Sequence, residues 1–180
     1  MKKMFNPQSK TGYRFMVWTF KIMDLFKNPD QRLEDFNLKE GNVVVDYGCG
    51  PGRYIRKAAQ LVGPQGRVYA ADIQPMAIDL VRQKIAKSNL ANVTPVFLNE
   101  NAGAIRDRCA DVVYALDMFH QIEDPVDFLA GIHRIIKPEG VLFLEDGHQP
   151  RSQSLDKVQR SEHWRVTREN KHWMELKPAA

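Results

Sequence analysis

Three glycines that alternate directly after a β-branched run constrain the fold of this chain more than any other feature. Residues 43–45 are valines, Asp46 follows them, and glycines occupy every second position through 48–52, before an apolar helical pattern over 53–61. This order predicts a buried strand, a glycine loop and a helix. Because glycine adopts dihedrals closed to other residues and carries no side chain, a ligand could lie directly on such a loop.

The spacing of the glycines also separates two kinds of ligand. A dinucleotide fingerprint is G-x-G-x-x-G, whereas the sixth position of the run that begins at Gly48 is Arg53. A purely structural turn from strand to helix is the other alternative, but a tight turn needs only one glycine and no acid two positions before the run. The loop is therefore interpreted as a ligand cradle whose register is wrong for NAD.

The rest of the chain repeats the alternation of strand and helix, which predicts one α/β domain for the 180 residues. Asp72 ends the second predicted strand, and a hairpin signal surrounds the turn at 170–171. The predicted strands are 43–45, 67–71, 93–98, 111–116, 141–144, 164–169 and 172–177, and further helices are predicted from positions 30, 74, 123 and 152.

The run 46–52, DYGCGPG, closely resembles the first motif of class I S-adenosylmethionine-dependent methyltransferases. Segment 117–122 resembles the part of the family that follows strand four. Segment 135–142 resembles the family's lysine-proline-glycine turn before strand five, with Glu139 in place of the usual glycine. The resemblance implies an α/β fold with a Rossmann-like seven-stranded sheet, of order 3-2-1-4-5-7-6 with strand seven antiparallel.

The resemblance also divides the chain into two parts. Residues 41–180 would form the S-adenosylmethionine-binding methyltransferase domain, and residues 1–40 a helical extension that packs on the cleft or caps it. Within that extension, residues 13–26 carry a dense apolar pattern that predicts one helix. Packing at the domain edge, a lid over the cofactor cleft and an interfacial membrane helix are three alternatives for it.

The cofactor, S-adenosylmethionine, brings a set of expected contacts with it. In the family the acid and the glycine loop hold the methionine end, and an acid at the end of strand two accepts hydrogen bonds from the ribose. The ordinary alternative for Asp72 is a helix cap, and for the segment around Asn101, where the family usually has aspartate, a surface loop. The predicted cofactor contacts are Asp46, Tyr47, Gly48, Cys49, Gly50, Asp72, Ile73, Asn101, Ala102 and Asp117.

The methyl group of a sulfonium is already activated, so catalysis requires chiefly that the nucleophile be held in line with it. A hydroxyl or protonated amine would also need a base, and His120, Asp117 and His148 are the predicted catalytic residues. A divalent cation on Asp117, Asp146 and His148 is an alternative, but no spacing there is diagnostic, and no metal is predicted.

Composition excludes several classes of protein. The net charge is +4 and the basic residues are spread along the chain, which gives no footprint for nucleic acid. Cys49 and Cys109 are the only cysteines, which provides neither a disulfide framework nor a metal site and fits a cytoplasmic location. No apolar run reaches membrane-spanning length, so stable membrane insertion is not expected.

These observations predict a methyltransferase that acts on a small molecule by direct methyl transfer. Two cysteines are too few for the arsenic-methylating members of the family, and the segment after strand four lacks the motif of nucleic-acid base methylation. A quinone or lipid-like precursor is favoured by exclusion. A cofactor-binding accessory or sensor module without turnover and a dinucleotide-dependent oxidoreductase are the alternatives.

Overall fold

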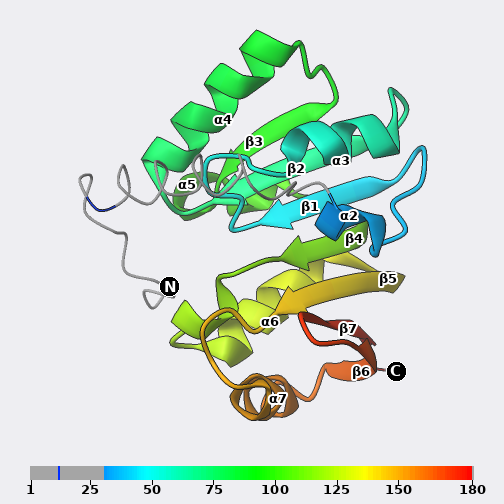
Figure 1. Cartoon of the computed structure of the whole chain (residues 1–180), viewed down its shortest axis with the longest axis vertical. Helices are drawn as coiled ribbons and strands as arrows, with labels where there is room; N and C mark the ends of the chain where they lie inside the picture. The colour runs from blue at the N-terminus through cyan, green and yellow to red at the C-terminus, as the bar shows by residue number, and fades with distance from the viewer. Residues whose placement is uncertain (1–11, 13–30, 180) are drawn as a thin grey trace.

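Seven strands form one sheet in the computed structural model of the chain, in the order β3-β2-β1-β4-β5-β7-β6 (Figure 1). The structure describes residue 12 and residues 31–179. Strands β1 to β5 pair in parallel, whereas β7 is antiparallel to both of its neighbours, β5 and β6. The strand order and the antiparallel seventh strand confirm the fold that the sequence predicts.

The elements alternate as the glycine-loop and hairpin patterns indicate. The strands are β1 (Val43–Tyr47), β2 (Arg67–Asp72), β3 (Val93–Phe97), β4 (Ala110–Ala115), β5 (Ile136–Glu145), β6 (Trp164–Glu169) and β7 (Trp173–Pro178). The helices are α2 (Gln31–Glu34), α3 (Ile55–Val62), α4 (Pro75–Ser88), α5 (Leu98–Asn101), α6 (Pro125–Ile135) and α7 (Arg151–Gln159), with 3-10 turns η1 (Ala102–Ala104) and η2 (Phe119–Gln121).

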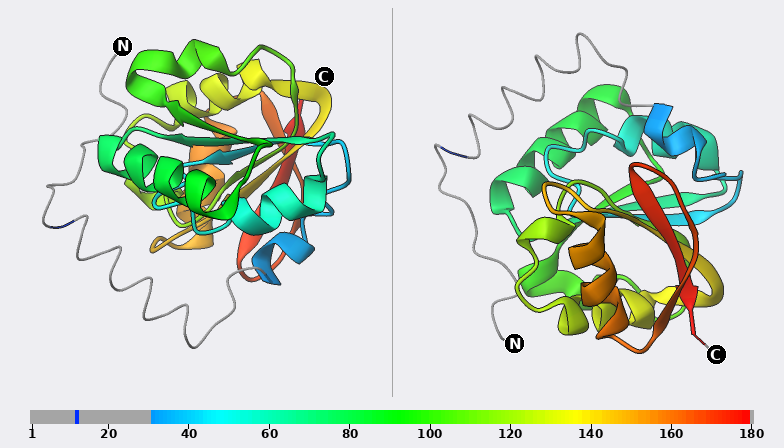
Figure 2. Two further views of the ribbon diagram at one scale, coloured as in Figure 1. Left: turned by 90° about the horizontal axis from the view of Figure 1, so that it is seen from above. Right: turned by 60° about the horizontal axis from the view of Figure 1, so that its bottom comes forward.

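Helices cover both faces of the sheet, which explains why the first strand is a continuous valine run (Figure 2). Val44 packs with side chains of α2, α3 and α4 on one face, and its neighbour Val45 packs with side chains of α6 and α7 on the other. Successive residues of a strand point to opposite faces, so both must be apolar when both faces are buried. Asp46 interrupts this run at a buried position of β1.

Strand β5 differs from its prediction because it begins at Ile136 and not at position 141. Its pairing with β4 shifts register between Ala110 and Val112, so the lysine-proline-glycine segment is absorbed as an irregular part of the strand. A Cβ at Gly140 would lie 3.0 Å from the carbonyl oxygen of Ala110. Close approach of the two backbones therefore requires a glycine here, and the residue continues the strand where a turn was expected.

Two other sequence predictions concern the segment after β3 and the apolar stretch near the N-terminus. Positions 99–102, predicted to lie at the adenine with a surface loop as the alternative, fall in the short turns α5 and η1, and the strand predicted to reach position 98 ends at Phe97. The apolar stretch 13–26 lies outside the described residues, and its three alternatives stay open. Among residues 12 and 31–179, no helix is both long enough and apolar enough to cross a membrane.

Candidate functional site

The glycine loop follows β1 with three glycines in the left-handed region. The φ angles of Gly48, Gly50 and Gly52 are +80°, +52° and +69°. A Cβ at Gly48 would lie 3.2 Å from the Met118 side chain, so the loop packs directly against the segment that follows β4. The alternating glycines are therefore required by backbone conformation and, at Gly48, also by close packing.

The backbone amides of this loop are used within the protein. The N–H groups of Gly48 and Cys49 donate to the Ala71 carbonyl at 2.8 and 3.0 Å, and Gly50 N donates to Asp72 Oδ2 at 2.8 Å. Gly52 N donates to the Cys49 carbonyl at 3.0 Å. A phosphate-binding loop presents free N–H groups to its ligand. These four amides do not, so the loop suits a ligand without phosphate and disfavours a dinucleotide.

Asp46 presents a buried acceptor beside the loop. Its side chain is 2% exposed, and neither its Oδ2 atom nor the hydroxyl of Tyr114, the residue opposite it on β4, has a hydrogen-bond partner among the described residues. Burial raises the pKa of the Asp46 carboxyl to about 8, and the nearby Tyr114 hydroxyl opposes that rise. A buried polar atom without a partner is costly. A ligand with N–H donors and positive charge, such as the methionine end of S-adenosylmethionine, would satisfy it.

Asp72 joins the loop to the end of β2. Its Oδ2 atom accepts from Gly50 N, and its Oδ1 atom accepts from Gln74 N at 2.8 Å. Burial raises the pKa of the carboxyl, and the amides of Gln74 and Gly50 oppose that rise. Each carboxylate oxygen can accept more than one hydrogen bond. Asp72 therefore holds the turn before α4 and keeps acceptor capacity for two ribose hydroxyls.

The other predicted cofactor contacts can act chiefly through their backbones. The Tyr47 ring packs edge-on against Phe128 in the core, with ring centroids 5.5 Å apart, and the Cys49 side chain is buried in the cluster on the opposite face. Ile73 is partly buried against the core at the end of β2. The backbones of Asn101 and Ala102 lie in the helical turns after β3, at the same edge of the sheet.

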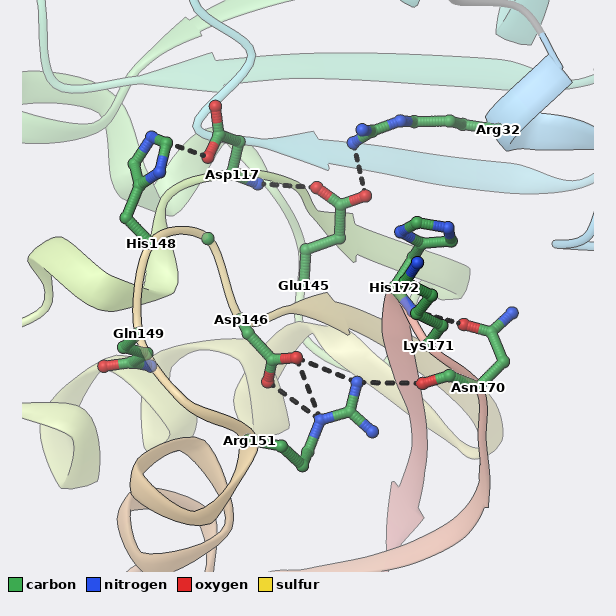
Figure 3. Close-up of a pocket in the computed structure, with 11 residues that line it drawn as sticks. Arg32, Asp117, Glu145, Asp146, His148, Gln149, Arg151, Asn170, Lys171 and His172 are labelled. Carbon is green, nitrogen blue, oxygen red and sulfur yellow. Dashed lines mark hydrogen bonds and ion pairs between the residues drawn. The ribbon is translucent and has the colours of Figure 1, made fainter.

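A polar hollow of about 600 Å³ opens beyond the carboxyl ends of β4 and β5, next to the β6–β7 hairpin (Figure 3). It contains two of the three predicted catalytic residues, Asp117 and His148, but not His120. The lining residues are Arg32, Asp117, Glu145, Asp146, Gly147, His148, Gln149, Arg151, Asn170, Lys171 and His172.

Asp117 lies beside His148, and both are among the three predicted catalytic residues. Asp117 Oδ1 is 3.8 Å from His148 Nε2, and the two side chains are 44% and 81% exposed (Figure 3). The His120 ring packs edge-on against His148, with centroids 4.9 Å apart. An exposed imidazole that faces a carboxylate has the arrangement of a base and its orienting acid.

His120 is less accessible than its position after β4 suggests. Its Nδ1 atom is buried and without a partner among the described residues, because it lies against the backbone of Gly147, where an added Cβ would be 2.0 Å away. The Nε2 atom is 3.2 Å from Gln121 Nε2. Burial lowers the pKa of His120, which keeps the ring neutral, while Asp117 opposes the shift.

Glu145 and Arg32 form a second pair in the hollow. Glu145, buried at the end of β5, accepts a hydrogen bond on Oε1 from Arg32 Nη1 and one on Oε2 from the backbone N–H of Asp117 at 3.1 Å. Burial raises the pKa of Glu145, and the Arg32 guanidinium opposes that rise. The sequence analysis missed Arg32, since it lies 113 residues away from Glu145 on a four-residue helix.

Arg151 fixes the other wall of the hollow. Its Nε atom donates to both carboxylate oxygens of Asp146 at 2.9 Å, and its two terminal nitrogens reach Glu169 Oε2 at 2.9 Å and the Asn170 carbonyl at 3.0 Å. These contacts tie the tip of the β6–β7 hairpin to the loop after β5. The hairpin was predicted from sequence, whereas this attachment had no local signal.

No group of three His, Cys, Asp or Glu side chains within residues 31–179 is arranged to hold a metal ion. Asp146, one of the three residues considered for a divalent cation, is engaged by Arg151.

The comparisons with known proteins agree with this geometry. The family model described as a methyltransferase domain matches residues 38–178. The chain belongs to this methyltransferase domain family. A solved S-adenosylmethionine-dependent methyltransferase from Aquifex aeolicus is 27% identical, with a TM-score of 0.69 over 84% of this chain and 88% of the other. A TehB-like S-adenosylmethionine-dependent methyltransferase from Corynebacterium glutamicum shares the fold at 16% identity, with a TM-score of 0.72 over 95% of this chain and all (100%) of the other.

Curated relatives share part of the chain. The ubiquinone/menaquinone biosynthesis C-methyltransferase UbiE of Marinomonas sp. (strain MWYL1) is 30% identical over 122 residues, which are 67% of this chain and 49% of that protein. The demethylmenaquinone methyltransferase of Geobacillus sp. (strain WCH70) is 26% identical over 121 residues, 67% of this chain and 52% of that protein. The chain spans about half the length of the curated relatives it matches. The predicted family and its cofactor, S-adenosylmethionine, are confirmed.

Proposed function

We propose that this chain transfers a methyl group from S-adenosylmethionine directly to a small molecule held in the polar hollow. One observation supports this most: the glycine loop and the hollow adjoin, because Gly48 packs on Met118 and the preceding residue, Asp117, lines the hollow. Ligands of open parallel sheets bind beyond the carboxyl ends of the strands, where both features lie. A cofactor on the loop would therefore neighbour an acceptor in the hollow.

Asp46, Asp72 and the glycine loop are the proposed cofactor-binding residues. When bound, the cofactor supplies a methyl group activated by its sulfonium. The Asp46 Oδ2 atom, which has no hydrogen-bond partner within the described part of the chain, would accept from the methionine end, and Asp72 would accept from the ribose. Asn101 and Ala102 complete the proposed site at the adenine. Two buried acids complement a cofactor that carries positive charge.

Proton removal from the acceptor is assigned to His148 with Asp117 as its partner. His148 is exposed to the hollow, whereas the Nδ1 atom of His120 is buried. His120 remains the alternative base, through its Nε2 atom. An imidazole side chain is suited to deprotonate a hydroxyl near neutral pH.

The acceptor class is a small molecule with a polar reacting part, because charged and amide side chains line the hollow. The relatives are named for ubiquinone and menaquinone biosynthesis, so a hydroxylated quinol ring is the first acceptor to test. Deprotonation of a ring hydroxyl makes the adjacent carbon nucleophilic, which gives the base a role in carbon methylation. A cytoplasmic location, expected from the two cysteines, is part of this proposal.

Calorimetric titration with S-adenosylhomocysteine and with NADH, followed by a methyl-transfer screen that includes short-chain quinols, tests the proposal. We expect binding of S-adenosylhomocysteine only, and cofactor-dependent methylation of at least one acceptor. Binding of NADH in its place would overturn the cofactor assignment. Binding of S-adenosylhomocysteine with no turnover across the screen would favour an accessory or sensor module.

A further inference from the structure

Asp117 has a backbone conformation that its surroundings must hold. Its φ angle is +53°, in the left-handed region, two residues after the end of β4. Such a conformation is unfavourable for residues other than glycine, and Asp and Asn tolerate it best. It persists at functional sites where neighbouring groups determine it. The group that contacts this backbone is Glu145, whose Oε2 atom accepts from Asp117 N at 3.1 Å.

Glu145 serves two elements at once. One carboxylate oxygen accepts from Asp117 and the other from Arg32 of α2, and the side chain is buried at the end of β5 (Figure 3). The charged and titratable groups that face it are Arg32, Asp117 and Tyr54. A buried carboxylate with both oxygens bonded has a fixed orientation, so it can fix the backbone that it contacts.

We propose that Glu145 is a positioning residue, which aims the Asp117 carboxylate at His148 by holding the Asp117 backbone N–H, and that Arg32 fixes Glu145 in turn. The inference rests on the proposed function of the hollow. Asp117 Oδ1 stands 3.8 Å from His148 Nε2, which leaves room for closer approach when an acceptor binds. A change in the backbone at residue 117 would turn this carboxylate away from the imidazole.

A readout independent of turnover is the amide resonance of residue 117 in the Asp117→Asn variant, where the side chain of that residue no longer titrates. Asparagine also tolerates the left-handed conformation. We expect this amide signal to shift with pH as Glu145 titrates, and to lose the shift in Asp117→Asn/Glu145→Gln. The matched control is Asp117→Asn/Glu175→Gln, because Glu175 pairs with Arg168 on the hairpin. An amide signal that titrates equally with and without Glu145 would overturn the proposal.

Arg32 provides a second test. Arg32→Leu removes the cation that opposes the raised pKa of Glu145, so the midpoint seen at the residue-117 amide should move to higher pH. Arg82→Leu, which removes an exposed cation paired with Asp79, should leave the midpoint in place. An unchanged midpoint in Arg32→Leu would contradict the role given to Arg32.

A third test is a double-mutant cycle of Glu145→Gln and Asp117→Asn, in which kcat is measured with the acceptor that the screen identifies. Glu145→Gln should lower kcat about tenfold, with affinity for S-adenosylhomocysteine within about threefold of the parent. In the Asp117→Asn background the same change should lower kcat by less than about twofold, since Glu145 acts through Asp117. If the loss of kcat in the double variant equals the product of the losses in the two single variants, the positioning role is wrong. If no acceptor is found, the amide resonances still decide the positioning, and the calorimetry decides the cofactor assignment separately.

Discussion

Two buried carboxylates stand at strand ends of the same sheet, and they differ in what surrounds them. Asp46 on β1 has an oxygen with no partner among the described residues, and burial raises its pKa to about 8. Glu145 on β5 has both oxygens bonded, one by a guanidinium and one by a backbone amide. Their burial is alike. The two acids differ in their hydrogen-bond partners. A buried acid whose oxygens are bonded within the protein stabilises the fold, whereas one with a free oxygen can bind a ligand.

This difference follows from the positions of the two strands. β1 lies in the middle of the sheet between β2 and β4, so the group opposite Asp46 is a buried tyrosine. The end of β5 can be reached from α2, which brings Arg32 to Glu145. An acid in the first setting gains most from a cationic ligand, whereas an acid in the second is already satisfied. Four experiments with five substitutions test this contrast, from the largest expected effect to the smallest.

Gly50→Val should abolish most of the cofactor binding that is assigned to the glycine loop. A β-branched residue at a φ of +52° costs about 1–3 kcal/mol, and displacement of the Gly50 N–H from Asp72 costs about 1.5–3 kcal/mol more. Affinity for S-adenosylhomocysteine, measured by calorimetry, should fall by about 10³-fold. Gly131→Val is the control, because a Cβ at that helical position meets nothing within 4 Å. A folded Gly50→Val protein with parental affinity would refute the loop assignment.

Asp46→Asn should change how stability depends on pH. The folded pKa of Asp46 is about 8, above its ordinary 3.8, so the folded protein holds a proton that the unfolded chain releases. The associated stability is complete below about pH 4 and is lost as pH rises to about 8. The free energy of unfolding of the parent should therefore fall by about 1.4 kcal/mol for each pH unit across that window, and Asp46→Asn should lack this fall. Urea titrations at several pH values measure it. Equal slopes in the two proteins would show that Asp46 is ionised and already satisfied.

His148→Ala and His120→Ala test which of the two histidines is the general base, a role that neither Asp46 nor Glu145 is proposed to have. If His148 is the base, its loss should lower turnover by about 10²-fold with S-adenosylhomocysteine affinity within about threefold. His120→Ala should have the smaller effect, because its Nδ1 atom is buried. Turnover that rises with pH in the parent, and loses this rise in only one variant, identifies the base. The reverse ranking would return the role to His120.

Arg32→Leu should have the smallest effect on stability, although it removes the partner of a buried acid. Arg32 is 47% exposed, so water replaces part of its interaction with Glu145. The free energy of unfolding at pH 7 should fall by about 1 kcal/mol, against a change within about 0.5 kcal/mol for Arg82→Leu on the surface. Equal losses in the two variants would mean that Glu145 does not depend on Arg32.

Local patterns predicted the strands and helices, and the family resemblance supplied the strand order. The valine run, the alternating glycines and the turn before β7 each act within a few residues, so the sequence displays them directly. The predicted start of β5 was wrong because Gly140 packs closely against the backbone of β4, 30 residues earlier in the chain. The contact between Arg32 and Glu145 could not be predicted for the same reason. Asp117 and His148 were both placed at the rim, but only the fold shows that they face each other. The contacts proposed for Asp72, Asn101 and Ala102 with the cofactor remain predictions.

The internally bonded amides of the glycine loop bear on selectivity inside a cell. ATP and other adenine nucleotides share their adenosine with S-adenosylmethionine and are abundant competitors for any adenosine pocket. A triphosphate laid on this loop would lose its hydration and find the amides of Gly48, Cys49, Gly50 and Gly52 already donating elsewhere. It would also meet two acids, Asp46 and Asp72. The bonded amides and the two acids therefore both disfavour a phosphorylated competitor, whereas an adenosine cofactor without phosphate requires no free amide from this loop.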